Sequence, residues 1–280
     1  MPKCVLLLIL AIPSLASAQQ QLTADEIMAK VAANQDKAVE LRSHYIYKQH
    51  THTTSHKANG KLMREESDDF DVFPTATGFD RKLQALTGRY WHNGKYVDFK
   101  GEPVPDADSV DAGITHDLVH DTDQHAARDG IGSHLFPLTT DRQKDYEFHL
   151  IGEEMLQGRP VYHIAFGPKD KHDYDWAGEA FIDKAEFQPV NVFTKLSRKL
   201  PFFVRSVMGV DVPGAGFSVQ YVRVEDGVWF PESFGTEMGL HLFHLWSRTF
   251  TISLKNSDFQ KTHVDTKIDT SPATSAPPKP

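Results

Sequence analysis

The chain has almost no cysteine. Its 280 residues include one, Cys4, so no disulfide can form within the chain, because a disulfide needs two thiols. If the N-terminal segment that carries Cys4 is removed, the rest has no thiol nucleophile and no cysteine ligand for a metal ion. Cysteine avoidance suits an oxidising compartment such as a bacterial periplasm, where stability must come from packing.

Long hydrophobic runs are also missing. The apolar stretch 5–12 is too short to cross a bilayer, which takes about 18 or more apolar residues, and no other stretch reaches that length. Lys3 precedes this stretch, and an Ala-Ser-Ala sequence at 16–18 follows it, which is the pattern after which a signal peptidase cuts. The sequence therefore predicts a secretory signal peptide over residues 1–18, cleaved near Ala18, and a periplasmic location for the remainder.

Positive charge is scarce. The chain has 30 Lys and Arg against 38 Asp and Glu, a formal net charge of -8. Nucleic-acid binding needs clustered Lys and Arg against phosphates, so the sequence predicts no nucleic-acid partner. The same balance argues against binding to an anionic membrane surface by charge alone.

Two common catalytic motifs are missing. The sequence has no G-x-S-x-G nucleophile elbow, and no glycine-rich loop followed by Lys and Ser or Thr. Asp68 and Asp69 predict a solvated strand or turn rather than a general acid–base pair. The sequence therefore predicts a protein that is not an enzyme, although spacing alone does not exclude a Ser–His–Asp triad, since triads assemble in space.

An amphipathic helix is predicted over residues 23–42. Thr23 can cap its N-terminus, and Glu26 completes a capping box three residues later. Apolar residues recur at helical spacing along one face, at Ile27, Val31, Ala38 and Leu41.

Beyond His44 the period of the pattern changes to two, which indicates strands. Turn signals for hairpins occur at 59–60 (Asn-Gly), 93–94 (Asn-Gly) and 157–158 (Gln-Gly). About ten strands joined mostly by short connections predict a large antiparallel meander.

One domain is expected over residues 19–262. A polar segment rich in His and Asp, at about 106–140, is predicted to be a partly helical insertion into it. The last residues, 263–280, are rich in Pro, Ser and Thr and predict a disordered tail.

Three motifs occur in an order typical of one known family. They are the helix at 22–31 (LTADEIMAKV), the strand pair at 178–183 (GEAFID) and 187–190 (FQPV), and the late hairpin at 224–231 (VEDGVWFP). Together they resemble the periplasmic outer-membrane lipoprotein-sorting and lipoprotein-localisation family, the LolA-like proteins. The resemblance covers roughly residues 22–260.

The resemblance implies a mainly β (α+β) fold. This is a curved, antiparallel, incomplete β-barrel, covered on its concave side by the N-terminal helix and by loop or helix segments. It also implies an apolar cavity for an acyl chain or lipoprotein cargo, no cofactor, and a partner protein in the inner or outer membrane. An incomplete barrel leaves an open apolar face, and a buried chain gains about 0.8 kcal/mol per CH₂.

Alternate strand positions supply candidates for contact with such a chain: Tyr45, Tyr47, Phe148, Ile164, Phe166, Val192, Phe217, Val219, Tyr221 and Trp246. The alternative is that these residues form a packed core, since buried aromatic side chains mostly do. For Leu200, Phe202 and Phe203 the sequence also leaves two interpretations open. They predict either a lid or membrane-touching tip, or a loop packed over the end of the barrel.

Histidines suggest one metal candidate. His116 and His120 are four residues apart, so on a helix they would share a face, as zinc ligands can. The alternative is a set of solvated surface histidines, which chelate only adventitiously.

Three functions follow from these observations. The leading hypothesis is a periplasmic binding protein that holds an acyl chain or lipoprotein in an apolar cavity, for lipoprotein sorting and transport or envelope lipid handling. The alternatives are an envelope sensor or interaction module that binds a membrane-protein partner, and a metal-dependent hydrolase built on His116 and His120.

Overall fold

The computed structural model describes residues 21–75, 79–101, 109–119, 136–171, 175–197, 210–211, 216–242 and 246–262. The predicted signal peptide, the predicted tail, and Leu200, Phe202 and Phe203 lie outside these residues. None of the helices in the described part of the chain combines the length and the apolar character that a membrane span requires.

The predicted N-terminal helix is confirmed as α1 (Ala24–Arg42). Its capping box is complete. The Glu26 backbone N–H donates to the Thr23 hydroxyl at 3.3 Å, and the Thr23 backbone N–H donates to the Glu26 carboxylate at 2.8 Å. These bonds satisfy N–H groups that otherwise have no partner inside the helix. Ile27, Met28 and Val31 are fully buried and form the packing face of the helix.

Thr23→Ala tests the cap. The substitution removes the hydroxyl acceptor, and we expect the melting temperature at neutral pH to fall by about 2–4 °C. Backbone and hydroxyl hydrogen bonds from Thr23 hold the pKa of Glu26 below its ordinary value. The stabilising effect of the box is therefore present above the ordinary Glu pKa and is lost as the pH falls through the lowered one. Melting curves should accordingly show the wild-type advantage shrinking in acid, and an advantage that grew in acid would contradict this account.

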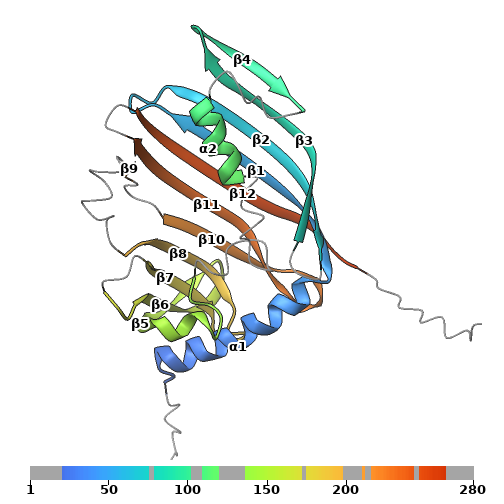
Figure 1. Ribbon diagram of the computed structural model, residues 1–280. Coiled ribbons are helices and arrows are strands. Elements are labelled where there is room, and N and C mark those ends of the chain that lie inside the picture. Colours follow the sequence, from blue (N-terminus) through green and yellow to red (C-terminus); the bar gives the residue numbers. More distant parts are fainter. Residues whose placement is uncertain are drawn as a thin grey trace, which may run out of the picture.

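The strands of the described residues form one antiparallel sheet, which has 12 strands. Their order is β4-β3-β2-β1-β12-β11-β10-β8-β7-β6-β5, with β9 paired to β11 (Figure 1). Their bounds are β1 (Tyr45–His56), β2 (Leu62–Pro74), β3 (Phe79–His92), β4 (Lys95–Lys100), β5 (Tyr146–Leu156), β6 (Arg159–Pro168), β7 (Trp176–Asp183), β8 (Pro189–Leu196), β9 (Val210–Asp211), β10 (Gly216–Arg223), β11 (Trp229–Leu242) and β12 (Trp246–Lys261). A second helix, α2 (Ser109–Val119), lies within the segment 106–140 that was predicted to be partly helical. The 3₁₀ turns η3 (Arg142–Asp145) and η4 (Glu225–Gly227) complete the described elements.

The pairing of β1 with β12 joins the two ends of the domain, while β4 and β5 remain as the two edges. The sheet is curved but not closed, so the predicted incomplete barrel is confirmed (Figure 1). The hairpin turns are also as predicted. Asn93 and Gly94 have φ of 45° and 88°, and Gln157 and Gly158 have φ of 51° and 80°, the positive values that tight two-residue turns need.

Strand register puts one set of side chains on a single face, here called the inner face. One row across the sheet shows the pattern, because directly paired residues point the same way. It runs through Asp68, Thr51, Leu254, Phe234, Val219, Val192, Ala180 and Ile164. Both helices lie against this face, α1 across the lower ends of the strands and α2 over β1 and β2 (Figure 1).

Candidate functional site

The inner face beneath α1 is a closed hydrophobic core. Helix residues including Ile27, Met28 and Val31 pack there against β6, β7, β8, β10 and β11. Seven of the residues predicted to contact a ligand belong to this cluster or pack against it: Phe148, Ile164, Phe166, Val192, Phe217, Val219 and Tyr221. Ile164, Val192 and Val219 are completely buried. At these three positions the side chains form packed core, the alternative to ligand contact. Phe148 and Phe217 are only partly buried.

An aromatic band continues from this core toward the middle of the sheet. It consists of Trp176, Phe217 and Phe234, with Leu254 beside Phe234 on β12. The Trp176 and Phe217 rings meet edge to face with centroids 4.2 Å apart, and the Phe217 and Phe234 rings stack with centroids 5.6 Å apart. All four side chains are partly exposed, whereas Val219, paired with Phe234, is fully buried. The band is therefore a preassembled apolar surface that keeps access to solvent.

Gly178 allows β7 and β8 to approach closely beside the band. Thr194 of β8 pairs with Gly178 of β7 on one side and with Phe217 of β10 on the other. Gly178 and Thr194 therefore lie in the part of the sheet that the Trp176 and Phe217 rings span. A Cβ added at Gly178 would lie 1.9 Å from the Phe193 carbonyl oxygen. Strands β7 and β8 approach too closely here for any other residue.

The remaining predicted contact residues lie elsewhere on the inner face. Tyr45 and Tyr47 are buried in a second cluster, where their rings pack edge to face on Phe230 at 5.1 and 6.1 Å. Trp246 is partly exposed at the start of β12, with the Arg248 guanidinium 4.9 Å from its ring centroid. The structure therefore does not gather all the predicted residues into one site.

A polar patch lies on the inner face beneath α2. Three hydroxyl residues of β1 pair directly with three charged residues of β2: Thr51 with Asp68, Thr53 with Glu66, and Ser55 with Arg64. All six side chains are at most 3% exposed. The expectation that Asp68 and Asp69 are both solvated is therefore wrong for Asp68, which points inward at 0% exposure, while Asp69 is exposed.

Two arginines attach α2 to the sheet, one near each end of the helix. Arg248 of β12 donates through Nε to both carboxylate oxygens of Asp111, at 3.0 and 3.1 Å. Arg81 of β3 donates to the Val119 carbonyl oxygen, where the helix presents carbonyls without internal partners. The buried residues of α2 alternate between polar (Asp111 and Thr115) and apolar (Ala112 and Val119). Polar as well as apolar contacts therefore hold α2 to the sheet.

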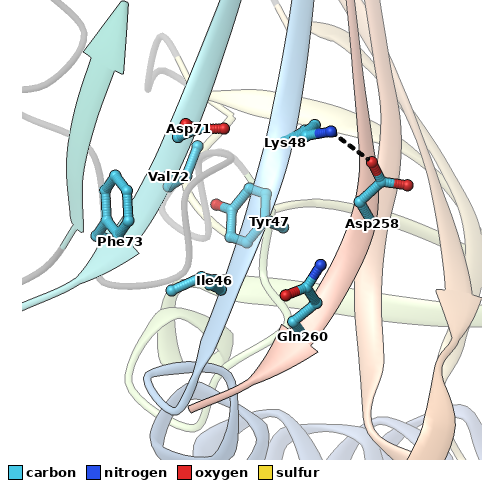
Figure 2. Close-up of a pocket in the computed structure, with 8 residues that line it drawn as sticks. All are labelled: Ile46, Tyr47, Lys48, Asp71, Val72, Phe73, Asp258 and Gln260. Carbon is cyan, nitrogen blue, oxygen red and sulfur yellow. Dashed lines mark ion pairs between the residues drawn. The ribbon is translucent and has the colours of Figure 1, made fainter.

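A small pocket lies where β2, β1 and β12 run side by side (Figure 2). It has a volume of about 210 Å³ and is lined by Ile46, Tyr47, Lys48, Asp71, Val72, Phe73, Asp258 and Gln260. An irregularity in the β1–β12 register at Ile46 and Lys48 lies in this region. Lys48 pairs with Asp258 at 3.0 Å, which raises the pKa of the lysine, but both side chains are more than half exposed. The volume is below the roughly 300–1,000 Å³ of typical ligand sites, so the aromatic band remains the better candidate.

The described residues add no support for a metal site at His116 and His120. His116 lies on the exposed side of α2, and His120 is outside the described ranges. Within those ranges, no three His, Cys, Asp or Glu side chains lie close enough together to hold a metal ion. A metal site at His116 and His120 therefore stays a prediction.

Sequence reasoning missed most of the band and the whole polar patch. Trp176, Gly178, Ala180 and Ile182 alternate in sequence and share the inner face. Extending the predicted strand 178–183 back to Trp176 would therefore have found the first ring. Phe234 lies beyond the predicted hairpin at 224–231, near a register shift between Gln220 and Tyr221 in the β10–β11 pairing that no local pattern reveals.

No family model matches this chain, and no curated protein matches it. Among solved structures, the chain is similar to a DUF1329 family protein from Desulfovibrio piger, with 13% identity, a TM-score of 0.38, and coverage of 90% of this chain and 96% of that one. It is also similar to a LolA superfamily protein from Nitrosomonas europaea, with 12% identity, a TM-score of 0.36, and coverage of 90% and 99%. A domain from Vibrio parahaemolyticus named for outer membrane lipoprotein sorting has 13% identity, a TM-score of 0.36, and coverage of 87% and 95%.

The family that the sequence resembles is thus represented among the structures to which the chain is similar. With TM-scores below 0.5, these likenesses carry no argument about function, which has to rest on the residues of this chain.

Proposed function

We propose that this protein is a periplasmic binding protein that holds an apolar chain, such as the acyl chain of a lipid or lipoprotein, on the inner face of its sheet, without catalysis. The observation that carries the proposal is the aromatic band of Trp176, Phe217 and Phe234. Its rings are ordered against one another and yet remain partly exposed beside a fully buried core. Lipoprotein sorting or envelope lipid handling is the role that such binding would serve.

The energetics favour a long chain. Each buried CH₂ contributes about 0.8 kcal/mol, so ten to twelve methylenes gain roughly 8–10 kcal/mol before the cost of association is subtracted. That cost is estimated at about 4–15 kcal/mol, so short chains bind weakly and long chains bind usefully. No directed hydrogen bond is needed along the band, which agrees with its apolar side chains.

Quenching of tryptophan fluorescence tests the proposal at the band itself. A fatty acid that carries a nitroxide on its chain should quench the protein, since Trp176 would contact the chain. The quenched fraction should fall in Trp176→Phe. It should rise slightly in Trp91→Phe, because that variant loses one of the four tryptophans without losing the quenched one. Trp91 is the matched control because it packs on Tyr96 and Lys61 at the β3–β4 hairpin, outside the inner face. Equal quenching in the two variants, or none in the wild type, would contradict the proposal.

A further inference from the structure

We infer that the polar patch beneath α2 binds the anionic, oxygen-rich head group of the same ligand, a carboxylate or phosphate. This inference rests on the proposed function, because it assigns the two ends of one amphiphile to two parts of the inner face. The apolar chain lies on the aromatic band, and the head group lies on the inner face over β1 and β2, at Ser55 and Arg64.

Hydrogen-bond donors without acceptors carry the inference. Arg64 is 2% exposed and uses Nη2 to bond Glu66 at 2.5 Å. Its Nε and Nη1 groups have no hydrogen-bond partner in the described part of the chain. A guanidinium can only donate, so the missing groups must be acceptors. A buried donor without an acceptor costs about 1–3 kcal/mol, which a bound oxygen ligand would recover.

The hydroxyls of β1 repeat the pattern. Thr51, Thr53 and Ser55 are 3%, 1% and 1% exposed, and each hydroxyl lacks a hydrogen-bond partner among the residues described. Ser55 pairs directly with Arg64, so its hydroxyl and the guanidinium belong to one site. The Ser55 hydroxyl and the Arg64 guanidinium match the oxygens of a carboxylate or phosphate, which bond most strongly to charged donors. The patch also holds two buried carboxylates, Glu66, which pairs with Arg64, and Asp68, four residues from Arg64 along β2. The head group is therefore assigned to the Ser55 and Arg64 end of the patch, the end away from Asp68.

The patch lies at a suitable distance from the band. Thr53, Ile252, Thr236 and Phe217 lie in one row across β1, β12, β11 and β10. Three strand spacings separate Thr53 from Phe217, roughly 14 Å. An acyl chain that starts at the patch can therefore run along this row to the Phe217 and Trp176 rings.

Access requires α2 to move away from β1 and β2, which it contacts. The buried side of this helix includes Asp111 and Thr115, so lifting it exposes less apolar surface than lifting α1 would. Arg248 and Arg81 hold its two ends by hydrogen bonds, which water can replace when the helix lifts.

Two matched ligands and three variants test the inference. Palmitate and methyl palmitate have the same chain, but only palmitate has an anionic head. We expect the wild type to bind palmitate at least about tenfold more tightly, the factor of one charge-assisted hydrogen bond. Thr53→Val and Ser55→Ala should weaken palmitate binding severalfold more than methyl palmitate binding, so that the preference shrinks. Thr54→Val is the control, because Thr54 lies on the opposite face of the same strand.

A stability measurement gives an independent readout. Because the hydroxyls of Thr53 and Ser55 are buried without partners, their removal should raise the melting temperature of the ligand-free protein by about 2–4 °C. Variants that lose both stability and palmitate preference would indicate a structural role and overturn the inference.

Two further outcomes separate this inference from the proposed function. Equal wild-type affinity for palmitate and methyl palmitate would overturn the head-group site and leave the chain-binding function intact. Binding of neither ligand would overturn both. Inorganic phosphate alone should leave the melting temperature unchanged. A shift as large as that given by palmitate would show a free-anion site and overturn the assignment to a head group.

Discussion

Phe217→Asp should reduce the affinity for a fluorescent fatty acid by at least about 100-fold. The substitution removes the central ring of the aromatic band and places a carboxylate where the acyl chain would lie. Transfer of a charged group into an apolar contact costs several kcal/mol, and each 1.4 kcal/mol is a factor of ten in affinity. Phe217 is partly exposed, so in the ligand-free protein the carboxylate can reach water and the fold should persist.

Phe193→Asp is the matched control. Phe193 lies on β8, the strand beside β10, with its side chain on the outer face and 44% exposed. The same charge change there should leave the affinity for the fatty acid near the wild-type value. If both variants lost affinity equally, net charge rather than the band would be responsible, and the location of the site would be wrong.

Arg42→Met should lower the free energy of unfolding by roughly 3 kcal/mol, the largest stability effect we expect from a single change on α1. Arg42 is 1% exposed at the end of the helix. Its Nε donates to the Trp229 carbonyl at 2.7 Å, and its Nη2 donates to the Gln35 side chain at 2.9 Å. Gln35 in turn donates to Gln188, 2.6 Å away next to β8. This chain of hydrogen bonds fixes α1 against the sheet.

Urea or thermal unfolding would measure the loss, which corresponds to a fall in melting temperature of about 6–12 °C. Lys37→Met, at an exposed position of the same helix, should change stability little. A variant as stable as the Lys37→Met control would contradict the role given to Arg42.

The sequence predicted well those elements that are determined by residues close together in the chain. The capping box at Thr23 and Glu26 marks the start of α1, and the positive φ of Asn93 and Gly94 follows from an Asn-Gly pair alone. Such features involve residues within four positions of one another, so their chemistry is visible in the sequence. The antiparallel meander followed from their number and order, whereas the incomplete barrel followed from the resemblance to the LolA-like family.

The site depends on contacts between distant residues, and these are not visible locally. The run from Arg64 to Asp69 is mostly charged, which predicts a solvated segment, yet Arg64, Glu66 and Asp68 point inward. Only the pairing of β2 with β1 and the position of α2 account for that burial. The aromatic band likewise joins β7, β10 and β11, whose relative register no single strand specifies.

The central claim is that the inner face holds an apolar chain, and native mass spectrometry of the full chain purified from its own envelope tests it most directly. Organic extraction of the same sample would then identify anything bound. We predict a discrete added mass that corresponds to one lipid or acylated molecule, reduced in Phe217→Asp and retained in Phe193→Asp. A bare protein mass in the wild type, together with no uptake of added fatty acid, would contradict the account.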